Sequence, residues 1–346
     1  MTWSGPQRSA IAAALGAAAL FGLTVPLAKR TLAVESPWLV AGLLYLGSGI
    51  GLGILAVMQR RRWTVARSEL PWLCGAILSG GVVAPVLLML GLGRDTASGA
   101  SLLLVTEGVL TSVIAWCVFR ENVDRRVLLG FLAITAGVVV LLADSARDGV
   151  APLPALFVLG ACLFWAIDNT FTRKVALADA PQLAALKGLI AGATNAALAV
   201  AAGARWPAAT TVAYVGLLGF LGYGASLVLF VVALRGLGAA RTSAYFSTGP
   251  FLGATAAVVL LGEPATVQLV AAGLLMVIGV WLHLTESHSH EHEHAELVHD
   301  HFHAHDEHHR HHPDGAAVAP HAHPHRHERL RHRHAHFPDS HHTHDH

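Results

Sequence analysis

Charged residues are scarce in this chain of 346 residues. Asp, Glu, Lys and Arg together make up 13%, whereas hydrophobic residues make up 54% and the mean hydropathy is +0.53. Up to residue 284 the charges fall between long apolar runs and seldom inside them. The length alone would allow two or three soluble domains, but this composition excludes them.

Cysteine is also rare, and a nucleotide-binding motif is missing. The three cysteines, Cys74, Cys117 and Cys162, all fall inside apolar runs, which indicates small apolar residues. This excludes a disulfide framework and a CxxC metal site. The sequence has no GxxxxGK[ST] phosphate loop, so we do not expect ATP to drive the protein directly.

Long apolar runs are what the chain does contain. Each run is about 20 residues, the length that crosses a bilayer as a helix, and lipid offers no other hydrogen-bond partners to the backbone. Arg8 precedes an Ala-rich stretch like that of a secretory signal, but nine further runs favour an uncleaved first helix. We therefore predict an all-α membrane protein with ten transmembrane helices, at about residues 9–28, 37–58, 70–91, 97–119, 127–143, 152–171, 182–202, 211–234, 242–261 and 265–284.

The chain repeats itself at an offset of 142 residues. Residues 91–142 align with 233–284 without a gap, and the alignment pairs Glu121 with Glu263 at the same helix boundary. Two copies of a five-helix unit enter the membrane in opposite orientations and enclose a site that is reached from either face in turn. This arrangement favours a transporter. The identical positions are Leu92, Ala97, Ser101, Thr106, Leu110, Ala115, Glu121, Leu132, Gly137, Val138 and Leu142.

The loop charges predict the orientation. With the N-terminus in the cytoplasm, inside segments carry 12 Lys or Arg residues and outside loops carry 5. Ten helices then place the C-terminus in the cytoplasm as well. Arg outnumbers Lys, and Ala and Gly are abundant, which indicates a GC-rich bacterial genome and the inner (plasma) membrane.

Short motifs recur at matching places in the two halves. The matching segments are ALFGLTVPLAKR with CLFWAIDNTFTRK, GLGRDTASGAS with ALRGLGAARTS, FRE with LGE, and GFLAITAGVVVL with AAGLLMVIGVWL. With these motifs the chain resembles the EamA-type drug/metabolite transporter superfamily over residues 9–284. The resemblance implies two EamA-like repeats, 9–145 and 151–284, and a transporter without enzymatic activity or a bound cofactor in the membrane core. Members export amino acids, metabolites or drugs, and a few are associated with nickel or cobalt efflux.

Polar residues inside a membrane span are costly and are therefore candidates for function. The candidates for the substrate pathway are Glu107, Thr111, Asp168, Asn169, Lys187 and Asn195, with the aromatic residues Trp165, Tyr223 and Tyr245.

Each candidate also has a structural interpretation. Glu107 would bond a neighbouring helix, and Asp168 and Lys187 would form an ion pair. Lys187 could instead extend to the membrane surface, which we expect as its most common fate. Asn195 would join two helices. For the aromatic residues, packing is the commoner explanation. Glu121 and Glu263, at helix ends, are expected to be structural.

Histidine is confined to the C-terminus: all 24 histidines lie between His283 and His346. Residues 285–346 have few apolar residues and are predicted to be disordered. Alternate spacing brings neighbouring imidazoles together, and imidazole suits nickel, zinc, cobalt or copper. The predicted metal ligands are His288, His290, His292, His294, His299, His301, His303, His305, His321, His323, His325 and His327.

Other roles for the tail stay open. With neutral histidines its charge is −6, and protonation of 23 histidines would bring it to +17, so it could sense pH and bind anionic lipid. It could also be an extension without function.

The sequence thus predicts a secondary transporter that exports small metabolites or drugs by alternating access. The alternatives are a divalent-metal (Ni, Co or Zn) efflux transporter and a membrane-anchored metal buffer or sensor. The membrane core argues against metal export because it has no histidine before His283. The expected partners are the lipid bilayer and a small-molecule or cation substrate, and no nucleic acid. A homodimer stays open.

Overall fold

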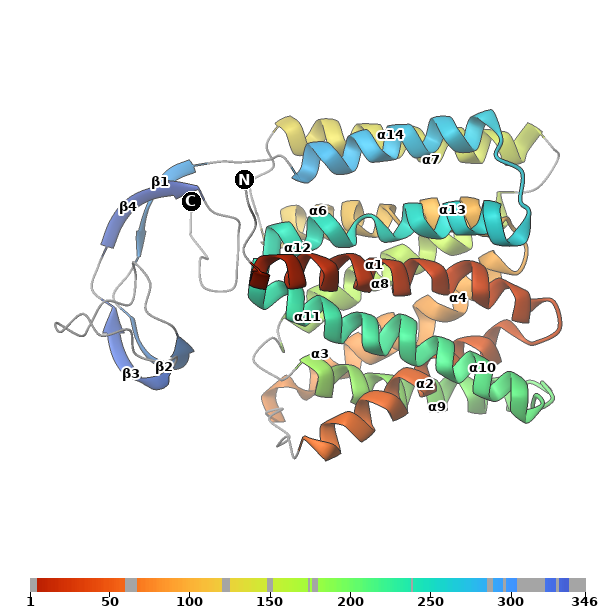
Figure 1. The fold of residues 1–346 in the computed structure, drawn as a ribbon, viewed down its shortest axis with the longest axis horizontal. Coiled ribbons are helices and arrows are strands. Elements are labelled where there is room, and N and C mark those ends of the chain that lie inside the picture. The colour runs from red at the N-terminus through yellow and green to blue at the C-terminus, as the bar shows by residue number, and fades with distance from the viewer. Residues whose placement is uncertain are drawn as a thin grey trace. The chain divides into compact units, whose positions relative to one another are not determined.

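The computed structural model describes residues 5–59, 67–119, 125–147, 152–173, 175, 180–237 and 239–284, and four short segments of the tail. The chain divides into two compact units, residues 1–285 and residues 286–346. The first unit is a bundle of helices (Figure 1). The predicted all-α membrane fold is confirmed.

The first half of the bundle follows the five predicted spans. α1 (Gly5–Leu32) and α2 (Pro37–Met58) are continuous helices, and α7 (Arg125–Arg147) ends the half. Between them, the third span consists of η1 (Arg67–Glu69), α3 (Leu70–Ala76), the π-helical segment η2 (Ile77–Val83) and α4 (Ala84–Leu92). The fourth span consists of α5 (Ala97–Leu103) and α6 (Thr106–Phe119).

The second half has the same order and the same interruptions. α8 (Leu153–Arg173), α9 (Ala180–Ala201) and α14 (Val267–Leu284) are continuous. The third span of this half consists of α10 (Ala209–Gly219), the π-helical segment η3 (Phe220–Ala225) and α11 (Ser226–Leu237). The fourth consists of α12 (Ala239–Phe246) and α13 (Gly249–Leu261). The offset of the repeat therefore relates the irregularities of the two halves as well as their helices.

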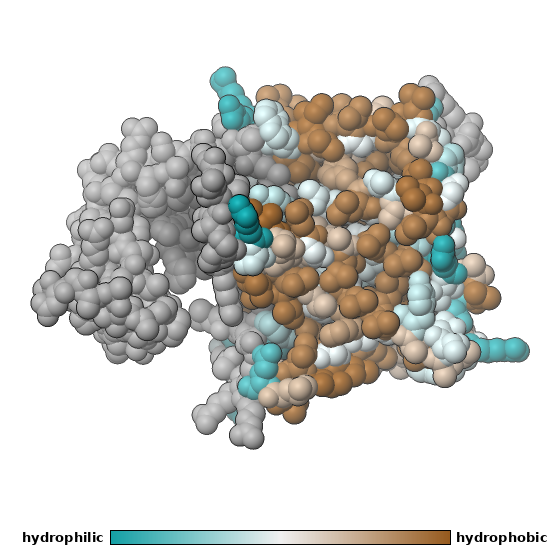
Figure 2. All heavy atoms as spheres, viewed as in Figure 1, coloured by the Kyte–Doolittle hydropathy of each residue, from teal (hydrophilic) through white to brown (hydrophobic). Residues whose placement is uncertain are grey.

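The lateral surface of the bundle is apolar, as expected for contact with lipid. Brown residues cover the visible face of the helices in Figure 2, and hydrophilic residues gather toward the two ends. Eight described helical segments are long and apolar enough to cross a membrane, and two shorter apolar helices, Gly249–Leu261 and Val267–His283, fill the last two predicted spans. The protein is a multi-pass membrane protein.

Close helix contacts inside the bundle depend on small residues. α2 and α9, one from each half, approach so closely that a Cβ atom on Gly188 would lie 2.8 Å from the backbone of Gly49. A Cβ atom on Gly192 would likewise lie 2.5 Å from the Leu46 nitrogen. α7 and α14 pack along each other in the same way across the halves (Figure 1). Small residues at such contacts let van der Waals packing hold helices together in lipid.

The tail contains four short strands in its described segments: β1 (Ser289–His294), β2 (Leu297–His303), β3 (His321–His327) and β4 (Leu330–Ala335). β1 pairs with β4 and β2 with β3, both antiparallel. This pairing differs from the predicted disorder. The alternation of histidine with other residues has the two-residue period of a strand, which is compatible with it. His288 and His305 lie outside the described residues.

Candidate functional site

Glu107 lies where the fourth span is broken. Leu104 and Val105 form a tight turn between α5 and α6, with the Val105 nitrogen donating to the Leu102 oxygen at 3.0 Å. Glu107 then falls in the first turn of α6. The positive end of the α6 dipole favours a carboxylate at this place. The break thus provides a setting for an acidic side chain near the middle of a membrane span.

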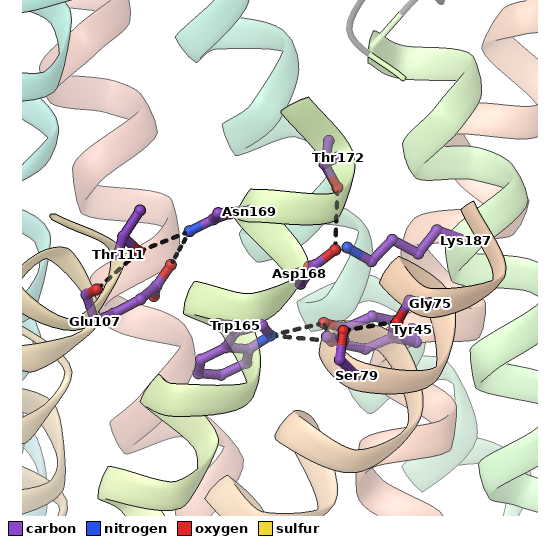
Figure 3. A network of polar contacts seen from close by, with 11 residues as sticks. Tyr45, Gly75, Ser79, Glu107, Thr111, Trp165, Asp168, Asn169, Thr172 and Lys187 are labelled. Atoms are coloured by element: carbon purple, nitrogen blue, oxygen red, sulfur yellow. Dashed lines mark hydrogen bonds and ion pairs between the residues drawn. The ribbon is translucent and has the colours of Figure 1, made fainter. Parts of the chain in front are cut away.

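Glu107 joins the two halves of the bundle through Asn169 on α8. The Asn169 amide nitrogen donates to the Glu107 carboxylate at 3.1 Å and to the Thr111 hydroxyl at 3.3 Å (Figure 3). Thr111 lies one turn after Glu107 and donates to its main-chain oxygen at 2.9 Å. Asn169 is exposed, while Glu107 is half-buried. Three predicted pathway residues therefore form one polar group between the halves.

Asp168 and Lys187 form an ion pair beside this group. The Lys187 amine on α9 contacts the Asp168 carboxylate, and the Thr172 hydroxyl donates to the same carboxylate at 3.1 Å (Figure 3). The side chains are 18% and 7% exposed for Lys187 and Asp168, respectively. The expected extension of Lys187 to the membrane surface is therefore wrong, because the amine finds a carboxylate within the bundle.

The π-helical segment η2 exposes backbone oxygens that side chains from three other helices satisfy. The Gly80 oxygen accepts from the Tyr45 hydroxyl of α2 at 2.7 Å and from the Trp165 indole of α8 at 3.0 Å. The Asn195 amide of α9 donates to the Gly81 and Val82 oxygens at 3.3 and 3.2 Å. Backbone groups freed by such a bulge need partners inside a membrane, and π segments are frequent at functional sites.

Gly80 leaves room for Asp168. A Cβ atom at Gly80 would collide with the Asp168 carboxylate, and a Cβ atom at the equivalent Gly222 of η3 would collide with the Thr24 side chain. The Asp168 side chain thus packs on Gly80 of η2 in the same way as the Thr24 side chain packs on Gly222 of η3. The two halves use the same packing, but among these two residues only the one from the second half is an acid, so this part of the bundle is not symmetric in charge.

Aromatic rings from both halves form one cluster. Tyr223 in η3 lies 5.5 Å from Tyr45 and 6.0 Å from Phe21 between ring centroids, and Phe246 lies 5.5 Å from Phe21. Tyr45 reaches the polar residues through the Gly80 oxygen, because Asp168 packs against Gly80. Aromatic faces suit an organic group that carries a positive charge.

Two predicted candidates lie outside this group. Tyr245 packs in a separate apolar cluster with Ala13, Ala14 and Ala233. The Asn195 amide is engaged with η2, which is the helix-joining role that the sequence allowed for it.

The contributors that were not predicted include Tyr45, Gly80, Thr24 and Thr172. Extending the repeat offset of 142 upstream pairs Gly80 with Gly222, which would have marked both bulges. Tyr45 and Thr24 give no comparable signal.

The charges of the group leave one carboxylate uncompensated. Asp168 and Lys187 offset each other, and the side chain that bonds the Glu107 carboxylate is the neutral amide of Asn169. In the described part of the chain, no group of three His, Cys, Asp or Glu residues is placed to hold a metal ion. The site can therefore bind a single positive charge, or a proton, next to aromatic rings.

Comparison with known proteins gives matches along most of the chain. The EamA-like transporter family matches residues 8–143 and 152–285. An uncharacterized transporter of Methanothermobacter thermautotrophicus is 26% identical over 282 residues, which cover 76% of this chain and 82% of the relative. The uncharacterized transporter YvbV of Bacillus subtilis is 25% identical over 279 residues, which cover 78% of this chain and 89% of the relative.

Two further similarities are shorter or more distant. The chain is 42% identical over 80 residues to the probable 4-amino-4-deoxy-L-arabinose-phosphoundecaprenol flippase subunit ArnE of Pseudomonas aeruginosa, which covers 23% of this chain and 67% of the relative. A protein crystal structure matches with a TM-score of 0.60 at 21% identity, covering 79% of this chain and 95% of the other. At that identity the likeness shows the fold alone.

Proposed function

The chain belongs to the EamA-like transporter family, and we propose that it exports a small organic molecule by alternating access at a site around Glu107. The protein itself is a membrane transporter with relatives named as transporters. The proposal concerns its substrate, its direction and its site. It places the protein in the inner membrane of a bacterium, as the composition indicates, with both termini in the cytoplasm, which the loop charges support.

The contact of Glu107 with Asn169 carries the proposal. It joins α6 of the first half to α8 of the second half at 3.1 Å, which is where inverted repeats form their substrate sites. Glu107 also stands at the start of a half-helix, a feature of such sites. A substrate that binds there would compete with Asn169 for the carboxylate and so change the contact between the halves.

The uncompensated charge favours an organic substrate that carries a positively charged group. Tyr45, Tyr223 and Phe21 form an aromatic cluster between the halves, and a cation over an aromatic face gains about 0.5–2 kcal/mol. A divalent metal would need several oxygen or nitrogen ligands, and among the described residues of this group Glu107 is the one carboxylate without a cationic partner. The core therefore favours the organic substrate over divalent-metal efflux.

We also propose that the tail binds divalent transition metals and modulates transport. The backbone register sets histidine opposite histidine at five places: His290 with His334, His292 with His332, His299 with His325, His301 with His323, and His303 with His321. Opposite residues in an antiparallel pair are close neighbours, and imidazole is a ligand for nickel, zinc, cobalt and copper. Titration of the full-length protein in detergent with Ni²⁺ and Zn²⁺, against a protein truncated at residue 286, tests this. Equal metal binding by both proteins would contradict it.

A comparison of cells that express the wild type, Glu107→Gln or Glu107→Asp tests the transport proposal. The cells are challenged with organic cations, amino acids, and Ni²⁺, Co²⁺ or Zn²⁺, and the cell content of each compound is measured. We expect the wild type to lower the content of an organic compound, Glu107→Gln to abolish this effect and Glu107→Asp to retain part of it. Lowered metal content with full activity of Glu107→Gln would contradict the proposed substrate and site.

A further inference from the structure

The two ends of the bundle differ in how closely the broken helices pack. The half-helix α5 packs against α13, and α1 packs against α5. The pairs in equivalent positions are α12 with α6 and α8 with α12, and the described residues of these pairs make no comparable contact. The same asymmetry holds for α2 with α4 as against α9 with α11. Among the described residues, the end with α5 and α13 is therefore packed more closely than its repeat-related counterpart.

The closed end is held by a carboxylate that crosses from one half to the other. Glu263 follows α13 and accepts from the main-chain nitrogens of Ala97 and Ser98 at 2.7 and 2.8 Å. These are the first two residues of α5. A charged acceptor on the free amides of a helix start is among the stronger hydrogen-bond arrangements. The backbone of Gly262, with φ of +70°, ends α13 in the left-handed region and precedes Glu263.

Two other polar contacts join the halves at this end. The Arg30 guanidinium at the end of α1 donates to the Leu260 oxygen of α13 at 3.0 Å. The Tyr214 hydroxyl of α10 donates to the Leu27 oxygen of α1 at 3.2 Å. Below them the backbones are nearly in contact, because a Cβ atom at Gly253 would lie 2.7 Å from the Gly22 oxygen and 3.0 Å from the Ser101 hydroxyl. Glu263 therefore adds a charged contact to an interface between the two halves that is already tightly packed.

We infer that this conformation is the state of the transport cycle that is open toward the α6 and α12 end, and that Glu263 is the latch that keeps the α5 and α13 end closed. The inference rests on the alternating access proposed above and adds the state and the residue that controls it. Asn169 is exposed and Ser101 is fully buried in this state. Opening of the latched end would separate α5 from α13 and reverse these exposures. Glu121, the repeat-related residue, lies outside the described residues.

Thiol labelling of full-length protein in detergent tests the latch without any substrate. A negative labelling result would thus refute the role of Glu263 without deciding whether the proposed substrate site is correct. Cys74, Cys117 and Cys162 are replaced by alanine, and a reporter cysteine is introduced as Ser101→Cys or Asn169→Cys. With Glu263→Gln we expect labelling of the Ser101→Cys reporter by a charged maleimide to rise about fivefold to tenfold. This factor corresponds to the free energy that is lost with one helix-capping interaction. Labelling of the Asn169→Cys reporter should fall in the same protein.

Matched variants separate the latch from other effects. Glu35→Gln makes the same charge change in the turn between α1 and α2 and should leave both labelling rates unchanged. Ala97→Pro removes one of the two donors, and the extended backbone of Thr96 (ψ 144°) accommodates a proline at the first helical position. It should shift both rates in the same directions as Glu263→Gln, by a smaller factor. Unchanged rates in Glu263→Gln and Ala97→Pro, a rise at both reporters, or an equal effect of Glu35→Gln would each overturn the inference.

Discussion

The Asp168–Lys187 pair can be tested by a double-mutant cycle that decides between an ion pair and a substrate contact. Lys187→Met removes the cation and leaves the Asp168 carboxylate with the Thr172 hydroxyl as its remaining described partner. Breaking a buried pair in this way costs about 3–5 kcal/mol in unfolding free energy. The Lys187 side chain is 18% exposed and Asp168 7%, so water partly reaches the pair. We therefore expect a loss of about 2–3 kcal/mol, somewhat below that range.

The second single variant and the double variant complete the cycle. Asp168→Asn leaves Lys187 unpaired and should cost a similar amount, whereas Asp168→Asn with Lys187→Met leaves no unpaired charge. The double variant should then be more stable than the sum of the two losses predicts, with a coupling of about 1–3 kcal/mol. Unfolding by SDS titration in mixed detergent micelles, followed by circular dichroism, measures the four proteins. A coupling under about 0.5 kcal/mol would mean that the two side chains do not stabilise each other.

Transport by the same four proteins separates the two roles. If the pair only holds α8 against α9, the double variant should recover transport together with stability. If either group also contacts the substrate, transport should stay low in the double variant although its stability recovers. Recovery of neither stability nor transport would refute the pairing as the reason for a buried acid at Asp168.

Three further results are expected. Gly80→Ala should lower the unfolding free energy by about 1–3 kcal/mol, because its Cβ would strike the Asp168 carboxylate; Gly53→Ala, with open space around its Cβ, should not be destabilising in the same SDS titration. Trp165→Phe should cost about 1 kcal/mol by removing one donor to the Gly80 oxygen, and an unchanged unfolding curve would contradict this. Truncation at residue 286 should leave the thermal unfolding midpoint of the bundle unchanged, since residues 1–285 form a unit of their own; a lower midpoint in a thermal scan would show that the tail supports the fold.

The helices were predictable because a membrane imposes both their length and their apolar character. The length of the apolar runs correctly predicted α1, α2 and α7 to α9 as continuous helices. It could not predict where the helices of the third and fourth spans of each half are interrupted. The turn at Leu104 and Val105 is as apolar as its surroundings, so no change in composition marks it. In the second half, Gly249 and Pro250 follow the corresponding turn and offer a clearer signal.

Several polar members of the site were predictable, but their pairing was not fixed, since the Asp168–Lys187 ion pair was one of several alternatives. Glu107, Asp168, Asn169 and Lys187 were identified because polar groups are costly in lipid. Which groups meet depends on the rotation of α6, α8 and α9 about their axes, and close packing decides that rotation. Lys187 shows the consequence. The sequence allowed its side chain to reach the membrane surface, but α8 and α9 both pack against η2, and this brings the amine to Asp168.

Glu263 shows how a repeat can reveal a residue without revealing its task. The alignment of Glu121 with Glu263 marked a position shared by both halves, and a structural role at a helix end was the expectation. The partner of Glu263 lies 166 residues away along the chain, at Ala97. Such a distant contact needs the three-dimensional arrangement of the two halves, because no local pattern indicates it.

The flux of a substrate through Glu107 variants in proteoliposomes tests the central claim most directly. Once the cell screen identifies a transported compound, wild type, Glu107→Gln and Asn169→Ala are reconstituted at equal amounts, and exchange of the labelled compound is followed. We predict saturable exchange by the wild type, a loss of at least about tenfold in Glu107→Gln, equivalent to about 1.4 kcal/mol, and melting temperatures that stay close to that of the wild type. Wild-type exchange by a folded Glu107→Gln protein would contradict the assignment of the transport site to this carboxylate.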